Sequence, residues 1–164
     1  MHMFKKNILA ALVILSLASC NPIGEKVAEI PLSAGEIGST NPIDLKKGDV
    51  ITIWSKIAER SDKEGGAAFK IKYNVESNGQ NIVFDTLRVN EGNHKINAEK
   101  TTESYTQSSS AGDSTKYYTL KQFEIENKKI TIPHDGKYNF DFKLVNGDYG
   151  LFNNDMLIIL RKTK

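Results

Sequence analysis

The amino-acid sequence predicts an all-β protein of about nine strands, folded as an antiparallel β-sandwich. Apolar and polar residues alternate with a period of two along residues 69–75 and again along residues 138–144. Strands with one buried and one solvated face show this alternation. No stretch after residue 20 shows a sustained apolar period of 3.6 over ten residues, the period of an amphipathic helix. Short β-rich segments separated by turn residues account for most of the remaining chain.

The first predicted strands are short. Residues 27–32, 43–45 and 50–57 are rich in β-forming residues and are bounded by Gly, Asn, Pro or Ser. A charged, glycine-bearing segment follows at residues 60–66. We expect this segment to be a solvated hairpin tip.

A tight hairpin is predicted in the middle of the chain. Residues 69–75 and 82–89 are its strands, and Asn78-Gly79 is its turn, because a primed turn needs the positive φ that Asn and Gly tolerate. A second turn is expected at residues 90–93.

Strands are predicted next at residues 95–105 and 117–125, separated by the Ser- and Gly-rich residues 106–115. We expect 106–115 to be a second solvated hairpin tip. Both tips could bind a ligand, as loops at strand ends often do, but a mobile loop without a partner is the favoured interpretation.

The last strands are predicted at residues 130–132, at 138–144 after the turn His134-Asp135-Gly136, and at 156–160. Residues 156–160 are apolar throughout, which predicts a central strand buried on both faces. Together the elements favour a sandwich of the jelly-roll or immunoglobulin-like kind. A closed barrel is the structural alternative.

The first twenty residues predict export. Lys5 and Lys6 precede a short apolar run at residues 8–18, the pattern of a secretory signal peptide. This run is too short for a bilayer core, which needs about 20 apolar residues. The four residues at the end of this run and just after it resemble the lipobox of bacterial lipoproteins: Leu17, Ala18, Ser19 and Cys20. A plain anchor helix, or a signal cut by the general signal peptidase, is the alternative.

The lipobox resemblance implies that the Cys20 thiol carries a diacylglyceryl group and that the mature chain begins at this residue. Residues 1–19 would be the signal peptide, 20–26 a short tether reaching about 20 Å at most, and 27–164 the β-sandwich domain. The membrane would then be a partner through the N-terminal lipid. Asn21 stands where retention in the inner membrane of enteric bacteria favours Asp. The resemblance therefore implies a lipid-anchored protein of the bacterial cell envelope, in the outer membrane facing the periplasm.

The composition after cleavage limits the classes of partner. Lys5 and Lys6 are the only charged residues before Cys20, so the mature chain keeps 20 of the 22 basic residues against 20 acidic ones. No basic excess marks a nucleic-acid partner. Cys20 is the single cysteine, and an exported chain with one thiol forms no internal disulfide.

Residues suited to catalysis are few. Outside the signal the only histidines are His94 and His134, both beside turns, and no motif of a nucleophile with its base, of a zinc hydrolase or of a phosphate loop is present. The sequence therefore predicts a non-enzymatic protein without a cofactor. Asp148 and Asp155, with neighbouring Asn residues, could offer oxygen ligands to calcium. Turn chemistry explains the same residues and is favoured.

Aromatic residues provide candidates for ligand binding. Trp54, Tyr105 and Tyr149 fall partly outside the core alternation, and exposed aromatic rings stack on sugars or anchor protein partners. Trp54 stands within Ile51-Thr52-Ile53-Trp54, where a packed ring is favoured.

A second resemblance covers part of the domain. Gly136-Lys137-Tyr138-Asn139-Phe140-Asp141-Phe142, with Gly48-Asp49 before an earlier strand, is similar to GOLD-type and bacterial pre-peptidase-type β-sandwich domains. This resemblance implies an interaction or accessory module. We therefore expect a lipid-anchored accessory subunit with an envelope protein as its partner. A carbohydrate-binding module is the alternative, and a small hydrolase is less favoured.

Overall fold

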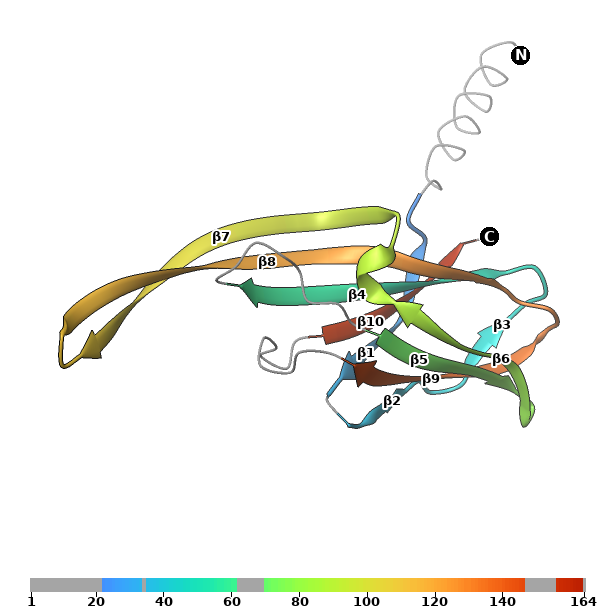
Figure 1. Ribbon diagram of the computed structural model, residues 1–164. Helices are drawn as coiled ribbons and strands as arrows, with labels where there is room; N and C mark the ends of the chain where they lie inside the picture. Colours follow the sequence, from blue (N-terminus) through green and yellow to red (C-terminus); the bar gives the residue numbers. More distant parts are fainter. Residues whose placement is uncertain (1–21, 34, 62–69, 147–155, 164) are drawn as a thin grey trace, which may run out of the picture.

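The protein is a sandwich of two antiparallel β-sheets, each with five strands (Figure 1). A computed structural model describes residues 22–33, 35–61, 70–146 and 156–163. Strands make up most of these residues and no α-helix is present among them, so the predicted all-β antiparallel sandwich is confirmed, with ten strands in the described ranges. A 3₁₀ turn, η1 (Val89–Glu91), joins β6 (Gln80–Arg88) to β7 (His94–Ser109).

The first sheet has the strand order β1-β10-β4-β8-β7. Its strands, in that order, are β1 (Glu25–Leu32), β10 (Met156–Thr163), β4 (Val50–Ser61), β8 (Gly112–Thr131) and β7 (His94–Ser109). β10 lies between two neighbours, as its apolar sequence predicted. Ile158 and Leu160 join the main core, whereas Ile159 points to the other face and is also buried.

The second sheet has the strand order β2-β9-β5-β6, with β3 paired to the other end of β9. Its strands, in that order, are β2 (Ile37–Ser39), β9 (Gly136–Asn146), β5 (Lys70–Ser77), β6 (Gln80–Arg88) and β3 (Ile43–Leu45). The predicted β5–β6 hairpin is confirmed, because Asn78 and Gly79 have φ values of 54° and 74°.

The core fills the space between the sheets. Alternate residues of each strand point into it, among them Ile53 of the first sheet and Ile71, Val75 and Phe140 of the second. Tyr138 is fully buried where the chain passes from β8 to β9, and its hydroxyl donates to the carbonyl oxygen of His134, four residues earlier (2.8 Å). A bond of this form, from a tyrosine hydroxyl to the backbone a few residues upstream, is called a tyrosine corner, and here it helps to fix the crossing between the two sheets.

Two expectations about the strands differ from the structure in extent. Residues 106–115 form the exposed tip of the β7–β8 hairpin, as predicted, but the loop is shorter than expected, because β7 continues to Ser109 and β8 begins at Gly112. Residues 130–132 are not a separate strand, because β8 runs without interruption to Thr131. In both cases the strand continues by backbone pairing through residues with no regular apolar pattern. Of the predicted tip at 60–66, residues 62–66 lie outside the described part of the chain.

β2 was not predicted, and it contains only three residues. Gly38 is central to its placement: a Cβ atom there would lie 2.6 Å from Ile30 Cγ2 and 2.9 Å from Leu32 Cδ2. The glycine therefore allows the edge of the second sheet to approach β1. A strand this short, with a glycine at its inward position, has no alternating pattern to detect.

Candidate functional site

The most distinctive surface is a two-stranded ribbon that projects from the sandwich (Figure 1). In the described part of the chain the last residue pair between β4 and β8 is Ser61 with Thr119, and Thr119 pairs on its other side with Thr102 of β7. We call residues 102–119 the hairpin arm. Every residue from 102 to 117 is exposed, so both faces of the arm contact solvent for most of its length.

Threonine, serine and tyrosine make the arm a pair of strands. β-Branched and aromatic residues favour extended backbone, and directly opposed threonines interact favourably across strands, as Thr106 with Thr115. At the tip, Ser109 Oγ donates to the Gly112 carbonyl oxygen (3.0 Å) and accepts from the Ala111 N–H (3.3 Å). Gly112 has φ 113°, which glycine adopts without strain.

Aromatic rings lie on both faces of the arm. Tyr105 and Tyr118 share one face, with ring centroids 6.2 Å apart, and the Tyr118 hydroxyl donates to the Glu103 carboxylate. Tyr117 points to the opposite face and is 66% exposed, while Tyr105 is 47% exposed. Large amphipathic rings on a protruding element are suited to contact with another macromolecule.

The outer edge of the arm is a long strand edge. β7 ends the strand order of the first sheet, and its register with β8 is continuous from Glu99 to Ser109. The shift in register lies nearer the base, between Ile96 and Glu99, where Asn97 has φ 52°. Globular proteins usually shorten, twist or cover such edges, because an exposed strand edge pairs readily with another chain.

A polar junction fixes the base of the arm to the sandwich. The Glu124 carboxylate on β8 accepts from Arg161 Nη2 on β10 (2.9 Å) and from Asn97 Nδ2 on β7 (3.0 Å). Arg161 lies over the ring of Trp54, at 5.7 Å, and His94 meets the same ring edge-on at 5.5 Å. The junction therefore ties three strands together beside one tryptophan.

The tip of the arm is far from the end of the sandwich that follows the predicted tether. At that end Glu25 of β1 pairs with Lys162, and Val50 pairs with both Thr163 and Thr131. β8 runs for 20 residues from the arm tip to Thr131. At about 3.3 Å per residue the length of this strand limits the distance from the tip to the tether end to roughly 65 Å.

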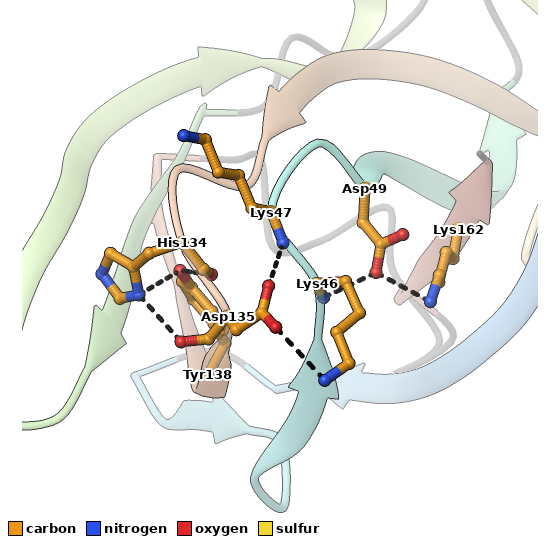
Figure 2. A network of polar contacts seen from close by, with 7 residues as sticks. All are labelled: Lys46, Lys47, Asp49, His134, Asp135, Tyr138 and Lys162. Atoms are coloured by element: carbon orange, nitrogen blue, oxygen red, sulfur yellow. Dashed lines mark hydrogen bonds and ion pairs between the residues drawn. The ribbon is translucent and has the colours of Figure 1, made fainter.

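A network of polar contacts stabilises the tether end (Figure 2). Asp49 accepts from the Lys46 N–H (2.8 Å) and pairs with Lys162 Nζ (2.7 Å). Asp135 accepts from the Lys47 N–H (2.8 Å) and pairs with Lys46 Nζ (3.3 Å). The ion pair with Lys162 is the largest cause of a lowered pKa at Asp49, and the Lys47 N–H is the largest cause at Asp135. These bonds hold the β3–β4 turn against the β8–β9 turn and β10.

The two histidines have structural contacts. His134 Nδ1 lies 3.2 Å from the Tyr138 hydroxyl and 3.1 Å from the Asp135 carbonyl oxygen. The hydroxyl donates to the His134 backbone, so the tyrosine corner already uses its proton. His94 Nδ1 lies 3.9 Å from the Glu126 carboxylate and packs on Trp54. His94 contacts Trp54 and Glu126 of the first sheet, whereas His134 contacts Tyr138 and Asp135 at the start of β9, so the two histidines share no contact residue.

The structure separates the remaining predicted site residues. Trp54 is 1% exposed, as its apolar neighbours favoured, but it packs against His94 and Arg161 and does not belong to the core between the sheets. Tyr105 lies on the arm. The other candidates lie outside the described part of the chain: Leu17, Ala18, Ser19, Cys20, Asp148, Tyr149 and Asp155. Within the described ranges, no three His, Cys, Asp or Glu side chains lie close enough to hold a metal ion. In the same ranges no helix is long and apolar enough to cross a membrane.

Comparison with known proteins finds no relative: no family model, no curated protein and no solved structure matches the chain. The functional argument therefore depends on the sequence and on the geometry described above.

Proposed function

We propose that the protein is a lipid-anchored accessory subunit of a bacterial cell envelope, which contacts a partner protein through its hairpin arm. In this proposal Cys20 carries the lipid, and the domain faces the periplasm from the outer membrane. The main support for this proposal is the arm itself. It is a ribbon exposed from residue 102 to 117 that takes no part in the core between the sheets.

Stability of the isolated fold does not account for the arm. A two-stranded hairpin is at best marginally stable in water, because it buries little apolar surface against the entropy of ordering its backbone. Exposed tyrosines and a continuous strand edge are features that a partner can use, the rings as anchors and the edge for strand addition. The arm is therefore best explained by a contact that it makes with another protein.

The position of the arm supports the same proposal. A tether of at most about 20 Å would keep the start of β1 close to the membrane, while the arm tip lies at the opposite end of the 20-residue strand β8, up to roughly 65 Å away. A lipid at Cys20 and a contact at Tyr105 or Tyr117 would then join a membrane to a protein well away from its surface. The proposal assigns no catalytic role to the domain.

Photo-crosslinking in the native cells tests the arm contact. A photoreactive phenylalanine analogue would replace Tyr117, and a second protein would carry it at Phe84 on the second sheet. The two side chains are matched controls, because both are aromatic and each is 66% exposed. We expect a discrete crosslinked envelope protein from position 117 only. Equal crosslinking at both positions, or none at either, contradicts the proposal.

A shortened arm provides the matching loss of function. Thr102 and Thr119 are directly paired across β7 and β8. Residues 103–118 can therefore be deleted and replaced by Asn-Gly, which should close the shortened hairpin with a tight turn. We expect the shortened protein to fold, with a melting temperature within a few degrees of the full chain, and to release the partner. A partner retained by the shortened protein would show that the contact lies elsewhere.

The anchor is tested separately. Cys20→Ser removes the only thiol, so labelling with a radioactive fatty acid should disappear and the protein should no longer be cut before residue 20. Normal cleavage and membrane fractionation of Cys20→Ser would contradict lipid anchoring while leaving the arm contact to be judged by crosslinking.

A further inference from the structure

The outer face of the second sheet carries an open groove of about 440 Å³ that the proposed arm contact does not use. Its floor and walls come from four neighbouring strands, β2, β9, β5 and β6. Residues that pair directly across strands point to the same face. One row across the groove is Ile37, Lys143 and Lys72, and the next row is Asp141, Asn74 and Phe84.

Apolar side chains form the two ends of the groove. Ile37 on β2 is 62% exposed and Phe84 on β6 is 66% exposed, and both line the groove. The four large apolar or aromatic side chains exposed in the described residues are thus divided between two surfaces, Tyr105 and Tyr117 on the arm and these two here. Three strand spacings separate β2 from β6, so the groove spans about 14 Å.

Two lysines face each other on the floor. Lys72 of β5 pairs directly with Lys143 of β9, and like charges directly opposite each other destabilise a sheet. Among the described residues neither lysine forms an ion pair, whereas some lysines of the sandwich do pair with carboxylates, as Lys46 does with Asp135 and Lys162 with Asp49. An anion between the two ammonium groups would remove their repulsion.

Amide and carboxylate groups complete the floor. Asn81 Nδ2 donates to Asn74 Oδ1 (2.6 Å), which orients both amides and leaves the Asn74 amino group and the Asn81 carbonyl oxygen for a ligand. Asp141 pairs directly with Asn74 and adds an acceptor. The amides of Asn74 and Asn81 and the carboxylate of Asp141 suit a ligand with hydroxyl groups, because each hydroxyl can both donate and accept a hydrogen bond.

We propose that this groove binds an acidic saccharide. Its carboxylate or phosphate would lie between Lys72 and Lys143, its hydroxyls would bond to Asn74 and Asp141, and its C–H face would pack on the Phe84 ring. A peptide fits less well, because the sheet face offers it side chains and no backbone ladder. The inference is independent of the arm contact.

The test measures binding of labelled oligosaccharides to the full protein in a non-ionic detergent. The probes are an oligogalacturonate, a phosphorylated oligomannose, a neutral glucose oligomer and hexaglutamate. We expect one or both acidic saccharides to bind at least tenfold more tightly than the neutral oligomer and than hexaglutamate. The carboxylate and phosphate probes distinguish the two possible sources of the anionic group.

Lys72→Gln with Lys143→Gln should weaken this binding at least tenfold, and Phe84→Ser should weaken it severalfold. The matched control is Lys100→Gln with Lys121→Gln, which removes another directly opposed lysine pair at the base of the arm. We expect the control to bind normally, as should the protein with the shortened arm. Absence of binding to both acidic probes, equal binding of the neutral oligomer or hexaglutamate, or an equal effect of the control variant would overturn the proposal.

Discussion

β8 passes through both the sandwich and the hairpin arm, and its two halves have the same antiparallel pairing but opposite environments. In the sandwich half, Ile125 and Ile130 are buried in the core, whereas in the arm half residues 112–117 are all exposed. Backbone pairing alone therefore extends a strand. Burial determines where apolar residues are needed, and hence how much each half contributes to stability.

The sandwich and the arm also differ in what their side chains do. The sandwich has a core between its sheets, and the side chains that pack in it supply most of the apolar burial. The arm has no such core, so its tyrosines and strand edge carry little stabilisation of their own. If the arm serves a contact, changes in the sandwich should alter folding and changes in the arm should alter binding.

The largest expected effect is in the core of the sandwich. Phe140→Ala removes a fully buried ring and should lower the free energy of unfolding by about 3–5 kcal/mol. Tyr117→Ala, on the arm, should change it by less than about 0.5 kcal/mol. Urea denaturation followed by tryptophan fluorescence measures both. A cost at Tyr117 comparable to that at Phe140 would mean that the arm is part of the folding core.

The junction at Glu124 should show an intermediate effect. Glu124→Ala leaves Arg161 and Asn97 without their shared acceptor. The cost should be about 2–3 kcal/mol, less than for a fully buried ion pair because both charged groups retain some contact with water. Glu103→Ala, on the arm, is the control and should cost about 0.5 kcal/mol or less. Amide hydrogen exchange should also accelerate along β7 in Glu124→Ala, and unchanged exchange there would show that the junction does not hold the arm.

The strands of the sandwich were predictable because burial on one face imposes alternation. Residues 69–75 and 138–144 show it clearly and correspond to β5 and β9, and the apolar residues 156–160 correspond to the central strand β10. The arm was not predictable in this way. Residues 106–115 contain the Ser, Thr and Gly typical of a loop, and only their cross-strand pairing makes them strands.

The candidate surfaces depend on pairing between strands distant in sequence. Lys72 and Lys143 each stand on the solvated face of a predicted strand, but only the β5–β9 register places them opposite each other. Ile37 belongs to a strand too short to predict. Tyr105 was identified as a candidate from its position outside the core alternation, and the structure adds that it shares one face of the arm with Tyr118.

The smallest expected effect is a pH dependence confined to the sandwich. The ion pair with Lys162 and the Lys46 N–H lower the pKa of Asp49 from its ordinary value near 3.8. A carboxylate with a lowered pKa in the folded state contributes stability above its unfolded pKa, and this contribution is lost as the pH falls through the folded pKa. The full protein should therefore lose more melting temperature between pH 5 and pH 2.5 than Asp49→Asn. Lys162→Met should reduce the loss similarly, and the double variant should add little because the two residues act as one pair.

The protein with the shortened arm should keep the full pH dependence, since Asp49 and Lys162 lie at the end of the sandwich opposite the arm tip. A reduced pH dependence after shortening would mean that the two regions are energetically coupled.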